Sequence, residues 1–220
     1  ADRPTAIAKM LRAIREFDST LVVLKRPRRP EDAELLRQEF SITRCLPGIR
    51  TVRPLAIDVS SDGPVLISMD VGGASLEAYR HNRLTLPNFL RLALQMVDAV
   101  AEVHGARLVH KDIKPSNFCL DAKGQSVFLA DFSIAEQLPE GVDDLPRASA
   151  LGGTLAYVSP EQTGRTEQLV DYRTDYYSLG VTFYELLAGK LPFDSTDPLE
   201  IVHGHLAKDP PALPGDIPEF

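Results

Sequence analysis

The stretch of sequence that decides the fold is His110-Lys111-Asp112-Ile113-Lys114-Pro115-Ser116-Asn117. A short apolar segment follows it and leads to a second polar stretch, Asp131-Phe132-Ser133. Asp112, Asn117 and Asp131 are spaced so that their side chains could converge on one metal ion and one phosphate group. Asp and Asn are also common loop-capping residues, so a purely structural role is the alternative for these three positions.

This pattern closely resembles the catalytic loop and the DFG motif of eukaryotic-type serine/threonine protein kinases. Residues 112–117 have the form Asp-x-Lys-Pro-x-Asn, which is typical of serine/threonine kinases, whereas tyrosine kinases usually have other residues there. Further matches follow in the family's order. Val22-Val23-Leu24-Lys25 resembles the third-strand motif with its lysine, and residues 153–161 resemble the end of the activation segment, with Ser159 in place of the usual alanine. Asp175 matches the residue that anchors the backbone of the catalytic loop.

The resemblance implies an α+β protein kinase-like fold with two lobes, truncated at both ends. Residues 1–71 are expected to form the N-lobe, a small antiparallel sheet with one helix and without its first strand. Residues 72–220 are expected to form a mainly α-helical C-lobe without its last helices. The two lobes together would make one kinase domain.

Local residue patterns also predict individual elements. Apolar and β-branched runs predict strands at Thr5–Arg12, Leu21–Lys25 and Pro64–Met69. Gly72-Gly73 is expected to be a flexible connection to a mostly helical remainder. Helical spacing predicts a long helix that begins at Pro87, with Phe89, Ala93, Met96, Val97 and Val100 on its apolar positions. A second long helix, Asp175–Ala188, is apolar nearly all round, which is typical of the centre of a core.

A charged residue interrupts the apolar face of the helix predicted at Glu31–Leu46. Leu35, Ile42 and Leu46 share that face, and Glu39 lies on the same stripe. Since charges are seldom left unpaired on a buried face, Glu39 either reaches water at the edge of the stripe or pairs with an inward-pointing cation.

The resemblance implies a role for each residue of the catalytic machinery. Asp112 would accept the proton of the substrate hydroxyl, and Lys114 would steady the γ-phosphate of ATP. Lys25 would hold the α and β phosphates, and Glu39 would hold Lys25 in place. A hydroxyl of Ser or Thr on a protein is the expected phosphate acceptor.

The same resemblance implies where ATP and Mg²⁺ bind. Asn117 and Asp131 would hold Mg²⁺, which prefers hard oxygen ligands. The adenine is expected to lie near Met69, Asp70 and Val71. Its apolar walls are expected to be Ile7, Val23 and Leu120.

The sequence departs from the family at the segment that normally covers the phosphates. The first glycine in the chain is Gly48, so no glycine-rich loop precedes the predicted strands, and backbone amides with side chains beside them approach phosphate less closely. This departure motivates an alternative function, a weak or inactive pseudokinase that senses nucleotide or acts as a scaffold. Two further residues bear on activation by phosphorylation. Lys111 stands where related kinases often have an arginine that binds phosphate on the activation segment, and Ser149 is the only residue with a hydroxyl between residues 134 and 153. Activation by phosphorylation of Ser149 is therefore only weakly supported by the sequence.

Composition narrows the remaining functions. A net charge of -7 argues against a general nucleic-acid binder, and no apolar run is long enough for a membrane span. The two cysteines are too few for a disulfide framework and indicate reduced thiols and a cytoplasmic location.

His203 and His205 do not share a helical face, so solvated or capping histidines are expected rather than a metal site. Residues 159–165 and 171–180 most resemble N-terminal kinase domains of multidomain sensor histidine kinases, which implies covalently linked downstream signalling domains.

Overall fold

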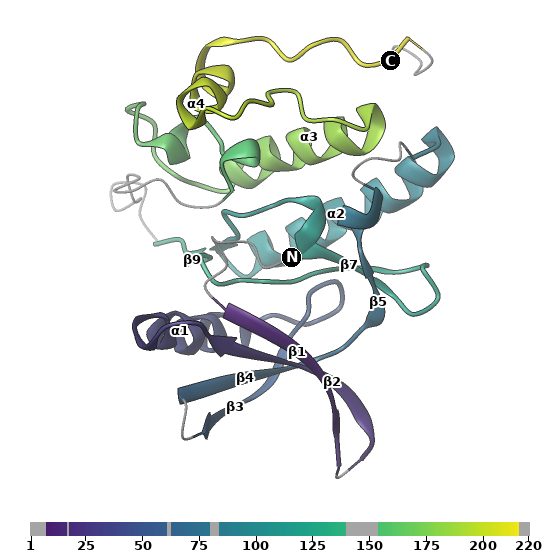
Figure 1. Ribbon diagram of the computed structural model, residues 1–220, viewed down its shortest axis with the longest axis vertical. Coiled ribbons are helices and arrows are strands. Elements are labelled where there is room, and N and C mark those ends of the chain that lie inside the picture. The colour runs from purple at the N-terminus through teal and green to yellow at the C-terminus, as the bar shows by residue number, and fades with distance from the viewer. Residues whose placement is uncertain (1–7, 17, 61–62, 80–83, 140–153, 216–220) are drawn as a thin grey trace.

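The computed structural model describes residues 8–16, 18–60, 63–79, 84–139 and 154–215 of the chain. A four-stranded sheet lies at one end of the molecule, and the long helices lie at the other (Figure 1). This arrangement confirms the α+β kinase-like fold expected from the sequence. Among the described helices, none combines the length and the hydropathy needed to cross a bilayer.

The sheet is antiparallel throughout and has the strand order β1-β2-β4-β3. Its strands are β1 Ala8–Arg15, β2 Thr20–Pro27, β3 Pro54–Ser60 and β4 Gly63–Met69. The strand predicted at Thr5–Arg12 therefore ends three residues later than expected, and residues 5–7 of that prediction lie outside the described residues. Pairing with β2 continues to Arg15, opposite Thr20, because the short connection allows the hairpin to close there.

One helix covers a face of this sheet (Figure 1). After a short 3₁₀ turn at Pro30–Asp32, α1 runs over Ala33–Thr43, which is shorter than the predicted Glu31–Leu46. Its buried side is formed by Leu36, Glu39 and Thr43, so the prediction that Leu35 lies on the buried stripe is wrong by one residue. Leu36 is fully buried against Ala8 of β1 and Leu66 of β4, a contribution of about 1.5–3 kcal/mol for a side chain of this size.

The helical part is built on α2 Leu86–Gly105, α3 Arg173–Ala188 and α4 Pro198–Ala207. Its core joins α2 and α3 to two small sheets. These sheets are β5 Gly72–Ser75, β7 Phe118–Asp121 and β8 Val127–Leu129 in the order β5-β7-β8, and β6 Leu108–Val109 paired with β9 Glu136–Gln137. Within the described ranges, further 3₁₀ turns lie at Leu76–Tyr79, Pro115–Asn117, Leu155–Tyr157 and Glu161–Thr163.

Gly72 and Gly73 do not form a flexible connection, as expected from the sequence, but belong to strand β5. β5 pairs with β7 and so ties the segment after the four-stranded sheet to the helical part. A Cβ atom at Gly73 would collide with the carbonyl oxygens of Leu120 and Asp121, so glycine is needed there for backbone packing.

The two long helices differ from their predicted apolar faces. On α2, Phe89, Ala93, Met96 and Val100 are buried as expected, but Val97 is 46% exposed. On α3, Tyr176 is 53% exposed, whereas polar residues are buried beside the apolar ones. The buried polar residues of α3 are Thr174, Asp175, Ser178, Thr182 and Glu185. A helix with so much buried polarity needs internal partners for each of these groups.

His205 on α4 is buried, contrary to the expectation of a solvated histidine. The Tyr177 hydroxyl of α3 lies 2.9 Å from its Nδ1, and the ring packs edge-on against Phe193. Burial lowers the pKa of His205, while the nearby backbone carbonyls of Ala156 and Leu155 partly oppose that shift. His203, two residues earlier, is exposed.

Replacing Gly73 by alanine is expected to lower the free energy of unfolding by at least about 1–3 kcal/mol, because the new methyl group overlaps the β7 backbone. Gly180→Ala is the matched control, since a Cβ there meets nothing within 4 Å and alanine favours a helix interior by roughly 0.5–1 kcal/mol. Chemical denaturation measures both changes. Equal stability of the two variants would contradict the close approach of β5 and β7.

The pKa of His205 predicts an acid-sensitive step in stability. Its folded pKa is below the unfolded value of 6.5, so the unfolded chain takes up the proton first and stability falls as the pH drops through that value. His205→Asn should flatten the dependence of the unfolding free energy between about pH 7 and about pH 5, and His203→Asn should leave it unchanged. An unaltered slope in His205→Asn would refute this assignment.

Candidate active site

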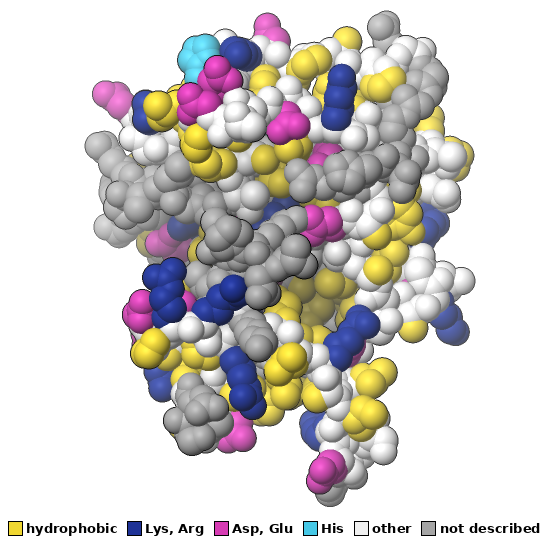
Figure 2. Space-filling view, in the orientation of Figure 1, with side chains coloured by type: hydrophobic (Ala, Val, Ile, Leu, Met, Phe, Trp, Pro, Cys, Tyr) yellow, Lys and Arg dark blue, Asp and Glu magenta, His cyan; other side chains and the backbone are white. Residues whose placement is uncertain are grey.

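A cavity of about 610 Å³ lies between the four-stranded sheet and the helical part. Figure 2 shows hydrophobic side chains around a hollow at this level of the molecule. The sheet side contributes the apolar Val23 and Leu66, and the helical side contributes Cys119 and Ala130. Charged and polar groups lie on the same lining, namely Lys25, Glu39, Asn117 and Asp131. Such a cavity suits a ligand with a flat apolar part and an anionic part.

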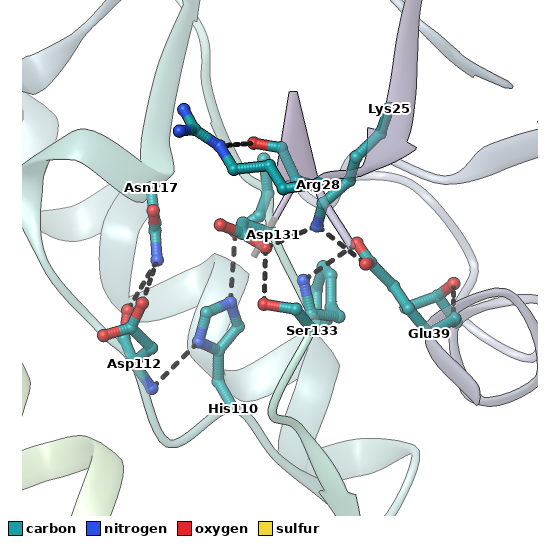
Figure 3. Close-up of polar contacts among 12 residues, drawn as sticks. Lys25, Arg28, Glu39, His110, Asp112, Asn117, Asp131 and Ser133 are labelled. Carbon is teal, nitrogen blue, oxygen red and sulfur yellow. Dashed lines mark hydrogen bonds and ion pairs between the residues drawn. The ribbon is translucent and has the colours of Figure 1, made fainter. Parts of the chain in front are cut away.

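A buried cation joins three distant segments at the cavity wall (Figure 3). Lys25 on β2 places its Nζ 2.7 Å from Oε2 of Glu39 on α1 and 2.6 Å from Oδ1 of Asp131, which follows β8. The side chains of Lys25 and Glu39 are only 7% and 6% exposed. The structure thus settles how the charge of Glu39 is accommodated, because it pairs with an inward cation and does not reach water.

The charges of this cluster support one another. Burial opposes the charge of Lys25, but the carboxylates of Asp131 and Glu39 outweigh it and raise the pKa of the ammonium. Burial also opposes ionisation of Asp131, yet the Lys25 charge and its hydrogen bond hold the pKa of this carboxyl well below its usual range. Burial raises the pKa of Glu39, and Lys25 offsets part of that rise. The cation therefore favours the ionised form of both carboxylates, the buried Glu39 and the partly exposed Asp131.

Backbone and side-chain hydrogen bonds fix the two carboxylates further. The Phe132 amide donates to Oε1 of Glu39 at 3.2 Å, and the Ser133 hydroxyl donates to Oδ1 of Asp131 at 2.8 Å. Asp131 has a backbone φ of +66°, which is unfavourable for a residue with a Cβ atom. Strain of this kind persists only where surrounding contacts determine the conformation, and it concentrates at functional sites.

Asp112 is held at the edge of this cluster by three polar residues. Its Oδ1 accepts hydrogen bonds from the backbone amide and the hydroxyl of Thr154 at 3.0 and 3.1 Å. Its Oδ2 accepts from Nζ of Lys114 and, at 3.1 Å, from Nδ2 of Asn117. Lys114 also donates to the Thr154 hydroxyl at 2.6 Å. The carboxylate is therefore fixed in orientation and lies beside a cation.

The backbone that carries Asp112 is anchored on helix α3. The fully buried Asp175 accepts hydrogen bonds from the His110 amide at 2.9 Å and from the Lys111 amide at 2.8 Å. The His104 ring lies 2.9 Å from the same carboxylate. This geometry confirms the anchoring role expected for Asp175.

The predicted nucleotide residues are largely brought together. Val23, Met69, Asp70 and Val71 line the cavity. Leu120 does not, and the prediction for it is corrected by one residue. On strand β7 alternate side chains face opposite sides, so Leu120 is buried in the hydrophobic core while its neighbour Cys119 lines the cavity. Ile7 lies outside the described residues, as do the segment in place of the glycine-rich loop and Ser149.

Sequence reasoning gave no role to two residues of the site. Thr154 contacts both Asp112 and Lys114, although it had been noted only as part of a longer motif. Arg12 on β1 lines the cavity, pairs with Asp70 at 2.7 Å and donates to the Gly73 carbonyl at 2.9 Å. The position of Thr154 directly after two glycines is only a weak sequence signal of a role in the site. Nothing in the sequence indicates a role for Arg12, because its partners are more than 50 residues away.

A family comparison decides the identity of the fold. The family model described as the protein kinase domain matches residues 6–210. This chain belongs to the protein kinase family. The cavity and the Lys25 cluster are therefore those of a kinase domain.

Several bacterial relatives of this kinase domain are themselves named serine/threonine kinases. The chain is 35% identical over 161 residues to serine/threonine-protein kinase pkn3 of Myxococcus xanthus, which covers 69% of this chain and 29% of that protein. It is 34% identical over 198 residues to serine/threonine-protein kinase PknA of Mycobacterium tuberculosis, which covers 86% of this chain and 44% of that protein. The chain thus spans less than half the length of these curated relatives.

The kinase family generally uses Mg²⁺, and the residues present fit this ion. Asn117 and Asp131 both line the cavity and offer an amide oxygen and a carboxylate, the hard ligands that Mg²⁺ prefers. Both hydrogen bonds described for the Asp131 carboxylate end on Oδ1, and Asn117 uses its Nδ2 to donate to Asp112. Oxygen atoms of both side chains are thereby left for a cation. Within the described residues no cluster of three His, Cys, Asp or Glu side chains forms a separate metal site.

Lys25→Met should lower the free energy of unfolding by about 3–5 kcal/mol near neutral pH, because it leaves two buried carboxylates without their cation. The loss should shrink as the pH falls, since Glu39 and Asp131 then take up protons and the repulsion between them disappears. Denaturation at several pH values measures this, with the exposed Lys190→Met as control. A loss independent of pH would show that packing rather than charge holds Lys25.

Proposed function

We propose that this domain transfers the γ-phosphate of ATP to the hydroxyl of a serine or threonine in a protein substrate. The observation that carries the proposal is the Lys25 ammonium, held between Glu39 and Asp131 on the wall of the cavity. Phosphoryl transfer requires little covalent chemistry from the protein and depends on positioning and on neutralisation of charge. A rigidly oriented cation next to a cavity of this size meets that requirement.

ATP would enter the cavity with its adenine against the apolar lining. Val23 and Cys119 lie on opposite sides of that lining, and residues 69–71 form its edge. Lys25 would then bind the α and β phosphates. Its ammonium lies at the cavity wall, and the carboxylates of Glu39 and Asp131 hold it in a single orientation. Asn117 and Asp131 would hold Mg²⁺, which when bound neutralises charge on the phosphates.

Asp112 is proposed as the residue that positions the substrate hydroxyl. Its carboxylate would accept a hydrogen bond from that hydroxyl and aim the oxygen at the γ-phosphorus. An O–P bond forms at the hydroxyl oxygen while the bond from the γ-phosphorus to the β,γ-bridging oxygen breaks, and ADP leaves. The hydroxyl proton passes to Asp112. Lys114, which contacts Asp112 and Thr154, would neutralise charge on the transferred phosphoryl group.

The alternative of a pseudokinase keeps the same site but no transfer. Its motive is the lack of glycines before Gly48. The relatives named as kinases support transfer, and so does the orientation of Asp112, which a module that only senses nucleotide does not need.

The setting of the domain in the whole protein is part of the proposal. The likeness of residues 159–165 and 171–180 to the N-terminal kinase domains of sensor histidine kinases supports covalently linked downstream signalling domains. We place the domain in the cytoplasm, because its two cysteines are free thiols. We also propose that residues 1–71 and 72–220 are the two lobes between which nucleotide binds.

Asp112→Asn tests the proposal in the full-length protein. Transfer of labelled γ-phosphate from Mg·ATP to a Ser/Thr protein substrate should fall by about 10²–10⁴-fold, because the carboxylate that orients the hydroxyl is lost. ATP affinity, measured by calorimetry, should change little, since Asp112 is not among the residues lining the cavity. Asp98→Asn, on the exposed side of α2, is the control. ATP binding without transfer by the wild type would favour the pseudokinase.

A further inference from the structure

The residue that precedes Asp112 has an unfavourable backbone conformation. Lys111 has a φ of +68°, in the left-handed region that residues with a Cβ atom rarely adopt. Its conformation sets the direction in which the next side chain leaves the loop. A strained peptide of this kind keeps one conformation only if both its amide and its carbonyl are held. Asp175 holds the amide at 2.8 Å.

The carbonyl of Lys111 is held by Gln162, which lies far along the chain in the 3₁₀ turn Glu161–Thr163. Nε2 of Gln162 donates a hydrogen bond to this carbonyl at 2.7 Å. The Gln162 side chain belongs to a residue that is only 3% exposed. This bond therefore forms away from water, where losing it leaves a buried carbonyl without its partner.

Ser159 fixes the other end of the same amide. Its backbone N–H and its hydroxyl both lie 3.2 Å from Oε1 of Gln162 and donate to it. The Lys111 carbonyl only accepts and the Ser159 amide only donates, so a single orientation of the Gln162 amide satisfies both neighbours. Ser159 is fully buried, and its hydroxyl also approaches the Thr174 hydroxyl of α3 at 3.4 Å.

Both attachments of the Lys111 peptide thus rest on one element of the fold. Asp175 belongs to α3, and Ser159 contacts α3 through Thr174. Thr174 in turn donates to Glu161, the residue next to Gln162, at 2.5 Å. The loop that carries Asp112 is held from two directions by groups that α3 keeps in place.

We propose that Gln162, oriented by Ser159, is a positioning residue that fixes the Lys111 peptide and through it the direction of the Asp112 side chain. This inference rests on the proposed role of Asp112 in phosphate transfer. Gln162 is buried and does not line the cavity proposed for nucleotide. Its removal therefore lowers the rate of transfer and leaves nucleotide binding intact.

Gln162→Met in the full-length protein removes the hydrogen bond to the Lys111 carbonyl and the two from Ser159, and it keeps the length of the side chain. The kcat for phosphate transfer should fall by about 10-fold or more, with the KM for ATP changed less than about 2-fold, because only the geometry at Asp112 is disturbed. Ser159→Ala should lower kcat less, and it should have no further effect in the double variant, since Ser159 acts through Gln162.

Gln95→Met is the matched control. Gln95 also bridges backbone groups, donating to the Gln125 carbonyl at 3.0 Å and accepting from the Val127 amide at 3.1 Å, but it lies on α2 away from Asp112. It should lower the melting temperature and leave kcat unchanged. A fall in kcat for Gln162→Met no larger than for Gln95→Met would reduce Gln162 to a structural role and overturn the inference.

Amide hydrogen exchange separates this inference from the proposed function. Exchange over residues 110–114 should become faster in Gln162→Met and in Ser159→Ala, because the Lys111 peptide loses a fixed partner. This readout needs no catalytic activity. A wild type that transfers no phosphate would defeat the proposed function alone, whereas unchanged exchange in both variants would defeat the positioning role. Ser159→Ala loses only one hydroxyl and serves if Gln162→Met does not fold.

Discussion

The Lys25 ammonium between Glu39 and Asp131 is the contact on which the arrangement of this protein depends. It joins strand β2, helix α1 and the segment after β8, and Lys25 and Asp131 are 106 residues apart in the chain. Burying three charges is costly unless their geometry is fixed and their other lone pairs are satisfied. The Phe132 amide and the Ser133 hydroxyl meet that need. The sheet, its helix and the start of the activation segment therefore have one relative position.

A second constraint is the buried polar side of α3. A helix at the centre of a core is expected to be apolar, but Asp175 and Thr174 point inward because two loops need anchors there. Asp175 satisfies backbone amides of the loop that carries Asp112, and Thr174 contacts Glu161 and Ser159 of the following segment. The buried polar residues of α3 thus hold the loops of the site in place, in addition to the packing of its apolar residues. This is why its polar residues are buried with partners within reach.

The sequence predicted the chemistry of the site better than its packing. The family resemblance implied that Glu39 holds Lys25, and the rule that a buried charge needs a partner agreed with that pairing. The contact of Lys25 with Asp131 was not predicted, since Asp131 was expected only to hold Mg²⁺. The sequence did not predict that Cys119 rather than Leu120 lines the cavity. In a strand of four residues, a shift of one position exchanges the side chains that face the cavity with those that face the core. Likewise Gly72-Gly73 has the composition of a flexible link, and only its pairing with β7 makes it a strand.

The charges around the cavity also explain why a divalent cation belongs to the proposed reaction. Among the described residues, the cations at or beside the cavity are Lys25, Lys114 and Arg12, and they are already paired with the carboxylates of Glu39, Asp131, Asp112 and Asp70. Without a further positive charge these carboxylates outnumber the cations, so a triphosphate would meet a site of its own sign. Asp131 can favour a polyanion only when it is neutralised by a cation bound beside it. In the proposed reaction, the same carboxylate that holds Lys25 in place would thus make nucleotide binding depend on Mg²⁺.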